Sequence, residues 1–499
     1  MSLTLGGFDS PKTQTGELKH ELLKRILASR LQIAKNALEL LAQHPNPNER
    51  VEQLILQLKE SDEFLILPKH LAQAQPLKEA KQKTTRERVE IVANYASTKP
   101  LESIKDISKY FAMRFNQYKR YLQNRLKNVQ SISNLKKINN EKVSVIGIIS
   151  DRRKTHRGNI ILKLEDLSGE TTAIITNKEL IPQAEEMLFD EVIGITGTIN
   201  KGVIFVEEIT VPDLPIKKEL KTLENTVYAA FLSDVHVGSK KFLSDKFENM
   251  LAFINGKETG ALIWEEQAEL IDNLKYIFVA GDIVDGIGVY PGQEKELNIR
   301  DIFAQYKETA KFFEKIPESI QIIMCPGNHD YVRLAQPQPP IEKDVAPDLY
   351  ELPNTTLISS PGIVKIRPQE NNGLNVLLYH GTSIDTIVPQ NPNLKDGYKH
   401  PEKVMLTLLK KRHLSPQYES GIVTAEFESD PLAIPEDIDI IHTGHVHSNG
   451  AVNYRGVTLI NSGTWQDVTD FQKFLGHEPT PARVPLLNLK TRQIRLLEF

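Results

Sequence analysis

Five apolar runs between Thr226 and Ile441 each end in side chains that can bind metal ions. The residues that follow each run are aspartate, asparagine or histidine, in most cases beside a glycine. Carboxylate, imidazole and amide oxygen together suit divalent ions such as manganese, iron or zinc, whereas thiolates would favour softer metals. These residues therefore predict a metal centre assembled from five separate loops. The loops carry Asp234 and His236, Gly281-Asp282, Gly327-Asn328-His329-Asp330, His380-Gly381, and Gly444-His445 with His447.

The spacing inside this set indicates a site on extended chain. Asp234 stands two positions before His236, and the last run ends in a similar His-x-His pair, whereas the histidines of a helical zinc motif lie one helical turn apart. Ligands that converge from several loops favour a centre of two ions about 3.5–4 Å apart. Such a centre needs a bridging carboxylate. We expect Asp282 in that position, because the glycine before it lets the backbone approach closely.

Turn chemistry is the competing explanation for these residues. One Gly-Asp pair or one histidine at the end of a strand usually marks a turn or a cap. Five such ends in one region, each with its polar residue present, favour the metal centre over turns.

Two carboxylates beside the ligands each have two possible roles. Asp330 could orient the imidazole of His329 or cap a following helix, and the cap is slightly favoured. Asp285 is either support for Asp282 or a simple turn residue.

Tyr290 and Arg333 are candidate substrate contacts on two of the loops. Tyr290 could stack on a terminal base, and Arg333 could bind a backbone phosphate, although packing or solvated roles are somewhat favoured for both. Cys325 is expected as a small buried residue and His442 as a core histidine. Surface positions are expected for His400, His413 and His477.

The elements that carry the ligands alternate between strand-like and helical patterns from Asn225 onward, which indicates a layered α/β domain. In open α/β sheets, ligands bind at the carboxyl ends of the strands. The polar ends should therefore meet at one edge of a β-layer.

Five strand-like runs before this domain predict an OB-fold barrel. A barrel of this kind has five strands and a helix before the fourth. The runs cover 142–150, 159–167, 170–176, 191–199 and 203–211, and the helix covers 182–188. OB barrels bind single strands or act as spacers between proteins. Phe205 is the only aromatic residue on these runs, so the structural role is favoured.

The N-terminal region is predicted to be helical. Apolar residues recur at helical spacing over 17–41, and a second helix covers about 49–59. This module is either a packing appendage or a docking site for a partner. Residues 68–100 read as a basic tether, and a helix over 101–129 follows. Its arginines and tyrosines, including Arg114 and Tyr118, are expected on a solvated face, with a nucleic-acid surface as the alternative.

Composition limits the protein class. The 499 residues suggest two or three domains, and the net charge of -4 means that a nucleic-acid role would need local basic patches. No apolar run approaches the roughly 20 residues that span a bilayer. The single cysteine and the absence of signal-peptide order at the start predict a cytoplasmic protein with no membrane partner.

The ligand motifs resemble those of the calcineurin-like metallophosphoesterase superfamily over Asn225 to Phe499, with every ligand position present. The resemblance implies two divalent ions, with manganese expected and iron, zinc or magnesium as alternatives. It implies that His329 is the general acid. It implies one ion held by Asp234, His236, Asp282 and His447, and the other by Asp282, Asn328, His380 and His445.

Longer stretches are similar to the small subunits of archaeal family D DNA polymerases, which also place an OB barrel before a phosphoesterase domain. The stretches are 284–294, 325–340, 379–387 and 443–489. The resemblance implies a proofreading 3′–5′ exonuclease, a large catalytic subunit as partner, and a DNA primer-template or single-stranded 3′ end as substrate. Synthesis would then belong to the partner.

The aromatic stretches 462–466 and 471–474 follow the last ligand, where exposed aromatics would suit a partner interface and burial against the sheet is the alternative. The resemblance favours the interface with the large subunit. The terminal stretch 493–499 is faintly like a sliding-clamp peptide, but a last β-strand explains it better. Two alternatives remain for the function: a stand-alone phosphodiesterase or repair nuclease, and a catalytically silent structural subunit.

These patterns give a multidomain α/β chain. Its expected parts are a helical N-terminal module (1–67), a basic tether and helix (68–138), an OB-fold β-barrel (139–216), and a layered α/β calcineurin-like phosphoesterase domain (217–499).

Overall fold

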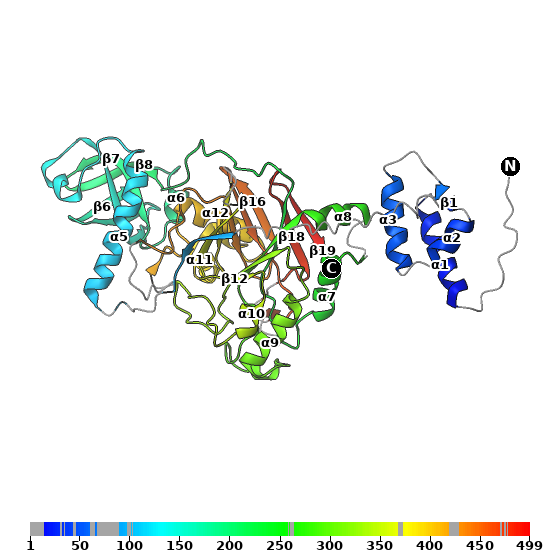
Figure 1. The fold of residues 1–499 in the computed structure, drawn as a ribbon. Coiled ribbons are helices and arrows are strands. Elements are labelled where there is room, and N and C mark those ends of the chain that lie inside the picture. Colours follow the sequence, from blue (N-terminus) through cyan, green and yellow to red (C-terminus); the bar gives the residue numbers. More distant parts are fainter. Residues whose placement is uncertain are drawn as a thin grey trace. The chain divides into compact units, whose positions relative to one another are not determined.

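A computed structural model divides the chain into two compact units, Met1–Thr85 and Arg86–Phe499. Each unit is considered by itself below. The structure describes residues 14–29, 32–33, 35–42, 46–59, 65–66, 89–96, 101, 103–257, 259, 264–367, 373–418, 429–469, 472–473, 476 and 478–499. Figure 1 shows the course of the chain.

The first unit is helical, as predicted, but its first helix is shorter than expected. Its helices are α1 (Gln14–Ala28), α2 (Lys35–Ala42) and α3 (Pro47–Lys59), and the short strands β1 (Gln32–Ile33) and β2 (Leu65–Ile66) pair in parallel. The single helix predicted over 17–41 is wrong, because the chain becomes extended at Gln32–Ile33. The break lets three helices enclose a core that includes Leu22, Leu38 and Val51.

The five-strand barrel is confirmed. Its strands close in the order β4-β5-β6-β8-β7, and β6 and β8 pair in parallel. Buried isoleucine, valine and leucine side chains fill its interior. The elements are β4 (Lys142–Lys154), β5 (Ile160–Asp166), β6 (Gly169–Ile175), α6 (Ile181–Glu185), β7 (Val192–Asn200) and β8 (Val203–Thr210). They lie within the predicted range 139–216, whose limits stay a prediction.

The α/β domain contains two six-stranded sheets, where the sequence suggested one β-layer. The first sheet runs β12 (Thr355–Leu357), β11 (Gln321–Cys325), β10 (Leu274–Ala280), β9 (Tyr228–Leu232), β18 (Arg483–Asn488) and β19 (Ile494–Glu498). The second runs β16 (Gly450–Tyr454), β17 (Val457–Asn461), β15 (Ile440–Thr443), β14 (Leu374–Leu378), β13 (Gly362–Ile366) and β3 (Val89–Asn94). The strand predicted at the C-terminal end of the chain is thus present as β19.

A shared apolar core joins the two sheets face to face. Phe231 and Phe278 of the first sheet pack with Val364 and Ile440 of the second. Alternate residues of the same strands, such as Leu232, point to a second core under the helices on the outer side of the first sheet. Because both faces of these strands are covered, their sequences read as continuous apolar runs. Such runs do not reveal how many sheets share them.

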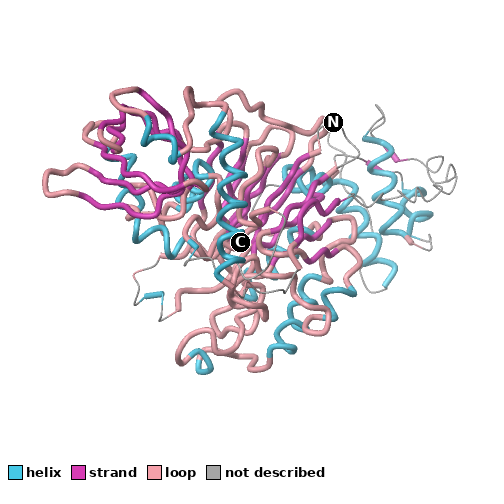
Figure 2. The backbone as a smooth tube through the Cα atoms, turned by 90° about the vertical axis from the view of Figure 1, so that its left-hand side faces the viewer, coloured by secondary structure: helices cyan, strands magenta, loops and turns pink. Residues whose placement is uncertain are grey.

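Helices cover the outer faces of both sheets (Figure 2). The first sheet is covered by α7 (Ser244–Ile254), α8 (Trp264–Asn273), α9 (Ile302–Phe313) and α10 (Pro347–Glu351). The second packs against α5 (Ile104–Gln123) and α12 (Pro401–Lys411), with α11 (Ile384–Gln390) beside α12. Short 3-10 helices lie at Ile132–Lys137, Gln293–Lys295 and Pro392–Leu394.

Part of the predicted tether is a strand. β3 pairs antiparallel with β13 at the edge of the second sheet, with Ile366 opposite Val89 and Gly362 opposite Asn94. The side chain of Asn94 also accepts a hydrogen bond from the Ser359 N–H at 2.8 Å. The tether prediction is therefore wrong for 89–94, while 67–88 lie outside the described residues.

The predicted solvated face of the next helix is also wrong. α5 starts at a capping box formed by Ser103 and Asp106, shorter at both ends than the predicted 101–129. Arg114 and Tyr118 are each only 2% exposed. Arg114 Nε lies 2.9 Å from the Asp430 carboxylate, so this helix is held to the α/β domain by buried polar contacts.

Candidate metal centre

The strands that precede the predicted ligands belong to both sheets and end at a shared rim. β9, β10 and β11 are parallel neighbours in the first sheet, and β14 and β15 are parallel neighbours in the second. Parallel strands deliver their carboxyl ends to one side. Three groups of metal-binding side chains result, each with ligand atoms within 4.8 Å of one another: Asp234, His236 and His447; His236, Asp282 and His329; and Asp282, His380 and His445.

Asp282 lies between the two halves of this cluster. Its Oδ2 is 3.2 Å from His380 Nε2 and 3.8 Å from His236 Nε2. Its Oδ1 accepts a hydrogen bond from the His329 N–H at 2.8 Å. No other carboxylate among the described residues belongs to two of the three groups. This is the position that the sequence predicted for the bridging carboxylate.

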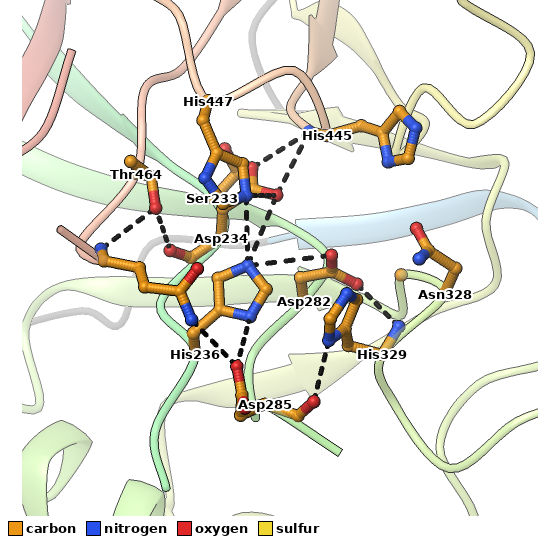
Figure 3. Close-up of polar contacts among 12 residues, drawn as sticks. Ser233, Asp234, His236, Asp282, Asp285, Asn328, His329, His445, His447 and Thr464 are labelled. Carbon is orange, nitrogen blue, oxygen red and sulfur yellow. Dashed lines mark hydrogen bonds and ion pairs between the residues drawn. The ribbon is translucent and has the colours of Figure 1, made fainter. Parts of the chain in front are cut away.

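One half of the cluster is built on Asp234. Asp234 Oδ1 lies 3.3 Å from His447 Nε2, and the Nε2 atoms of His236 and His447 are 3.1 Å apart. Figure 3 shows the two carboxylates, of Asp234 and Asp282, facing the His236 ring. The Asp234 carboxylate also accepts the His445 N–H at 2.9 Å, which ties together the loops after β9 and β15.

The other half is built on His380, which is fully buried. His380 Nδ1 lies 2.7 Å from the carbonyl oxygen of Ala280, so its Nε2 faces the site and lies 3.0 Å from Asn328 Oδ1. The ring of His445 is 5.0 Å from that of His380, measured between centroids. The site thus receives residues from all five strand ends.

Five of the seven predicted ligands have left-handed backbone. Their φ angles are 51° at Asp234, 53° at His236, 49° at Asp282, 73° at His445 and 58° at His447. Such conformations cost on the order of 1–3 kcal/mol each in a non-glycine residue and persist only where the surroundings impose them. At Asp234 the carbonyl accepts hydrogen bonds from Thr464 Oγ1 (2.9 Å) and the Trp465 N–H (3.0 Å). Strain concentrated on one set of side chains is typical of a functional site.

Gly327 shows how tightly the backbone approaches the site. A Cβ atom at this position would lie 2.1 Å from Asp282 Oδ1. Glycine is therefore required, because any side chain would displace the central carboxylate.

The electrostatics of the cluster favour bound positive charge. Burial opposes ionisation of the Asp282 carboxyl, but the neighbouring His380 and His329 outweigh it and hold its pKa well below the usual value. The pKa of Asp234 is lowered in the same way, against burial, chiefly by His447. Burial would lower the pKa of His380, yet the Asp282 carboxylate raises it to about 10. Buried carboxylates surrounded by imidazoles are a donor set that fits divalent cations.

Asp285 supports His236, which corrects both predictions for it. Its Oδ1 lies 3.1 Å from His236 Nδ1 and accepts a hydrogen bond from Gln466 Nε2 at 2.9 Å. Gln293 Nε2 donates to the other carboxylate oxygen at 3.2 Å. Asp285 therefore holds a predicted metal ligand in place through its outer nitrogen, a common arrangement around metal-binding histidines.

Both predictions for Asp330 are wrong. Its carboxylate accepts hydrogen bonds from the Gly327 N–H (2.8 Å), the Ile283 N–H (3.2 Å) and the Tyr306 hydroxyl (3.0 Å). It does not orient the imidazole of His329, and no helix begins in the fully described stretch 331–346. Burial, with the nearby Asp282, raises the pKa of Asp330 to about 6. This carboxyl connects two strand ends.

His329 stands at the side of the cluster. Its Nδ1 lies 2.7 Å from the carbonyl oxygen of Asp285, and its ring centroid is 4.7 Å from that of His236. Burial lowers the pKa of His329, against the opposing effect of the Asp282 carboxylate. The Nδ1 contact leaves Nε2 as the ring nitrogen that can exchange a proton with a substrate.

Three residues near the ligands were not foreseen. Asp385 on α11 places Oδ2 2.7 Å from His445 Nε2. Gln472 Nε2 lies 2.8 Å from His447 Nδ1, and Gln466 contacts Asp285 as described above. Of these three, only Asp385 could have been suspected from the sequence, because it follows the predicted ligand His380 within one short stretch. An isolated glutamine does not indicate a contact with a metal ligand.

The predicted substrate residues lie beside the cluster. Tyr290 donates its hydroxyl hydrogen to Glu296 Oε2 at 2.9 Å, and its ring centroid is 6.3 Å from that of His329. Arg333 Nη2 donates to the carbonyl oxygen of Pro337 at 2.7 Å. Their contacts with substrate stay predictions.

Other expectations divide between confirmed and wrong. Cys325 and His442 are buried, as expected, and about half of the His400 side chain is exposed. His413 is not a surface residue, because it is 3% exposed and its Nε2 lies 2.9 Å from the Asp430 carboxylate.

Trp465 is 2% exposed and packs 4.8 Å from the Phe247 ring, so this aromatic residue belongs to the core and not to an interface. His477, Phe471 and Phe474 lie outside the described residues.

Comparison with known proteins agrees with this geometry. The model of the family "Calcineurin-like phosphoesterase" matches residues 228–449. DNA polymerase II small subunits from Methanothermobacter thermautotrophicus and Archaeoglobus fulgidus are 41% and 39% identical to the chain, over 79% of this chain in both cases and 80% and 77% of their own lengths. The chain belongs to the family of archaeal DNA polymerase II small subunits. The resemblance to these polymerase subunits is thereby confirmed.

The small subunit of DNA polymerase II from Methanocaldococcus jannaschii is 42% identical over 78% of this chain. The match spans 64% of that relative, slightly less than two thirds of its length. Among the described residues, no helix is both long and apolar enough to cross a membrane.

Proposed function

We propose that this polymerase small subunit carries a two-metal 3′–5′ exonuclease that removes mismatched nucleotides from a primer 3′ end. The position of Asp282 between two groups of metal-binding side chains is the main support. Two-metal sites stabilise both the attacking and the departing oxygen in phosphodiester hydrolysis. Asp234, His236, Asp282 and His447 would hold one ion, and Asp282, Asn328, His380 and His445 the other. Manganese is the expected metal, with iron, zinc or magnesium as alternatives.

When bound, the two ions would supply a nucleophile from water at neutral pH and neutralise charge on the scissile phosphate. The residues of the chain then have two tasks, which are to orient the phosphodiester and to supply a proton to the departing oxygen. The ligand loops orient the phosphodiester so that water attacks phosphorus opposite the 3′-oxygen of the penultimate nucleotide. Hydrolysis adds hydroxide to phosphorus and a proton to that 3′-oxygen, and it releases a nucleoside 5′-monophosphate.

His329 would provide that proton or steady the phosphate. Its Nδ1 faces the Asp285 carbonyl, so Nε2 carries a proton only in the imidazolium form. A lowered pKa makes the imidazolium a stronger acid, which suits a group that protonates a departing alkoxide. Tyr290 and Arg333 remain proposed contacts to a terminal base and a backbone phosphate.

The partners are part of the same proposal. Relatives named as small subunits imply a larger subunit, which would carry out synthesis and bring the primer-template to both sites. A sliding clamp is a further proposed partner. The complex would act in the cytoplasm, at the nucleoid.

Replacement of Asp282 by Asn tests this function. The complex with the large subunit would be given a 5′-labelled primer with a mismatched 3′ end and manganese. We expect wild type to shorten the primer and Asp282→Asn to lose at least 10²-fold in rate while primer extension persists, because only the phosphodiester-cleaving centre is altered. Asp272→Asn, at an exposed position of α8, is the matched control.

Two results would argue against the proposal. Equal shortening by wild type and Asp282→Asn would place the nuclease elsewhere. The absence of shortening by the wild-type complex, with any of the four metals, would support a structural subunit.

A further inference from the structure

Two loops beside His329 expose four large apolar side chains. Ile287 and Val289 are 44% and 37% exposed in the loop after β10, and Tyr331 and Leu334 are 61% and 70% exposed in the loop after β11. We refer to these four residues as the apolar rim. Exposed apolar side chains that gather at one place usually mark a binding surface. The rim borders a cluster that is otherwise buried and polar.

The two loops are fixed to each other and to the site. His329 Nδ1 contacts the Asp285 carbonyl at 2.7 Å. A Cβ atom on Gly286 would lie 2.3 Å from the His329 carbonyl oxygen and 3.0 Å from Val289 Cγ2, so the loops touch where the rim begins. The Tyr331 N–H donates to the Tyr306 hydroxyl at 3.0 Å, and Tyr306 in turn binds Asp330. These contacts hold Val289 and Tyr331 beside His329, and Ile287 and Leu334 lie on the same two loops.

Tyr290 connects the rim to the cluster. Its hydroxyl is engaged with Glu296, and its ring lies 6.3 Å from the His329 ring. An occupant of the rim must thus present a phosphodiester at His329 and an apolar face a short distance away. A terminal nucleotide has both, because every base offers a flat apolar face beside a charged backbone.

We propose that the apolar rim holds the unstacked base at the 3′ end of a single strand. This inference rests on the proposed exonuclease and names the form of its substrate. Three of the four rim side chains have no hydrogen-bonding group, so the contact would not read which base is present. A base stacked and paired within a duplex cannot offer its face to the rim, whereas a mismatched terminal base can leave the stack at low cost. The rim would thereby favour unpaired ends.

Two changes, one in the protein and one in the substrate, are made separately and together to test the inference. The change in the protein is Tyr331→Ala/Leu334→Ala in the complex with the large subunit. The other is removal of the base from the 3′-terminal nucleotide of a single-stranded oligonucleotide. Single-turnover cleavage rates and kcat/KM would be measured with manganese for all four combinations. Tyr350→Ala/Leu496→Ala is the control variant, because these side chains are 41% and 43% exposed on α10 and β19.

The expected result is a strong coupling between the two changes. With a normal 3′ end, the rim variant should lose about 5- to 100-fold in kcat/KM, since a stacked base contributes about this much in single-strand binding. With the abasic end, wild type and rim variant should agree within about twofold, because the rim's partner is gone. The control variant should match wild type on both substrates. Unchanged primer extension and an unchanged melting temperature show that the rim variant is folded.

Other results overturn the inference in distinguishable ways. An equal loss on both substrates would mean that the loops act on the site and not on the base. No loss on either would leave the exonuclease standing without a role for the rim. Failure of the wild-type complex to cleave either oligonucleotide would overturn the proposed function itself, and the inference with it.

Discussion

Asp385 and His445 are joined by a contact of 2.7 Å between Oδ2 and Nε2 beside the candidate metal centre. This contact engages one ring nitrogen and leaves the other for an ion. Carboxylates that bind the outer nitrogen of a metal-binding histidine fix the orientation of its ring. Asp385 is about half exposed, so it performs this task at the surface.

Removal of the Asp385 carboxylate should weaken metal binding. We expect Asp385→Ala to reduce the affinity for the ion that His445 would help to hold by about 10- to 100-fold, because the His445 ring loses its orienting partner. Calorimetric titration of the metal-free protein with manganese measures this directly. Asp396→Ala removes a similarly exposed carboxylate that binds Lys403, and it should leave both affinities unchanged. Equal metal affinities of wild type, Asp385→Ala and Asp396→Ala would contradict the role of Asp385 in orienting His445.

Asp285 should act on the other half of the site. Asp285→Ala leaves His236 Nδ1 without its partner and frees Gln466, so we expect the first metal to bind about 10- to 100-fold more weakly. Asp285→Asn keeps a hydrogen-bond acceptor, so its metal affinity should lie between those of Asp285→Ala and wild type. Manganese titration followed by electron paramagnetic resonance would resolve the two sites. An unaltered first site in Asp285→Ala would refute the role.

The buried pair of Arg114 and Asp430 should stabilise the contact between α5 and the phosphoesterase domain. Removing one member of a buried ion pair typically costs about 3–5 kcal/mol, because the other charge loses its compensation. We expect Arg114→Leu to lower the free energy of unfolding by this amount in urea denaturation. Arg120→Leu on the exposed side of the same helix is the control. A double variant, Arg114→Leu/Asp430→Asn, should recover part of the loss.

His413 should make stability depend on pH. Burial and the nearby Arg114 lower its pKa from 6.5 to about 4, although Asp430 opposes the shift. A histidine with a lowered pKa stabilises the fold fully above pH 6.5, and this contribution is lost as the pH falls from 6.5 towards 4. The loss amounts to roughly 3 kcal/mol. The geometry agrees, because Nδ1 accepts the Ser415 N–H at 3.0 Å and cannot do so when protonated.

Thermal melting between pH 7 and pH 4 measures this effect. The melting temperature of wild type should fall across that window, and His413→Gln should show a shallower fall because it lacks the titrating ring. Parallel curves for the two proteins would show that other groups carry the pH dependence.

Trp465 should matter for folding and not for partner binding. Its ring packs against Phe247, and its backbone N–H holds the Asp234 carbonyl. We expect Trp465→Ala to cost about 3–5 kcal/mol in unfolding free energy, as large-to-small changes in a core do. Trp465→Phe should cost less. If Trp465→Ala left stability unchanged and weakened binding to the large subunit, the core position would be refuted.

The residues that gather in the candidate metal centre could be predicted because each is marked by its immediate neighbours in the sequence. Each ligand follows an apolar run, so residues such as Asp282 and His380 were recognisable without knowing how the strands are arranged. The arrangement itself was not recognisable. A strand buried on both faces has the same apolar sequence in one sheet as in two, and only the packing of Phe231 and Phe278 against Val364 distinguishes them.

Polar residues with distant partners were the other source of error. Arg114 and His413 look like surface residues in sequence, and their common partner Asp430 stands 316 positions after Arg114 and 17 after His413. The sequence suggests neighbouring partners for Asp330 and Asp285, but Ile283, Tyr306 and His236 come close to them only through folding. The strand Val89–Asn94 has no regular alternation, because it lies at the edge of a sheet and is largely exposed, and so it read as a tether.

That strand has a practical consequence for shortened versions of the protein. A version that starts at the barrel, near residue 139, would keep every ligand but would strip β13 of its neighbour and remove α5 together with Arg114. It would expose an unpaired strand edge, which invites aggregation. Shortened proteins made to study the nuclease should therefore begin before Val89, at the division after Thr85.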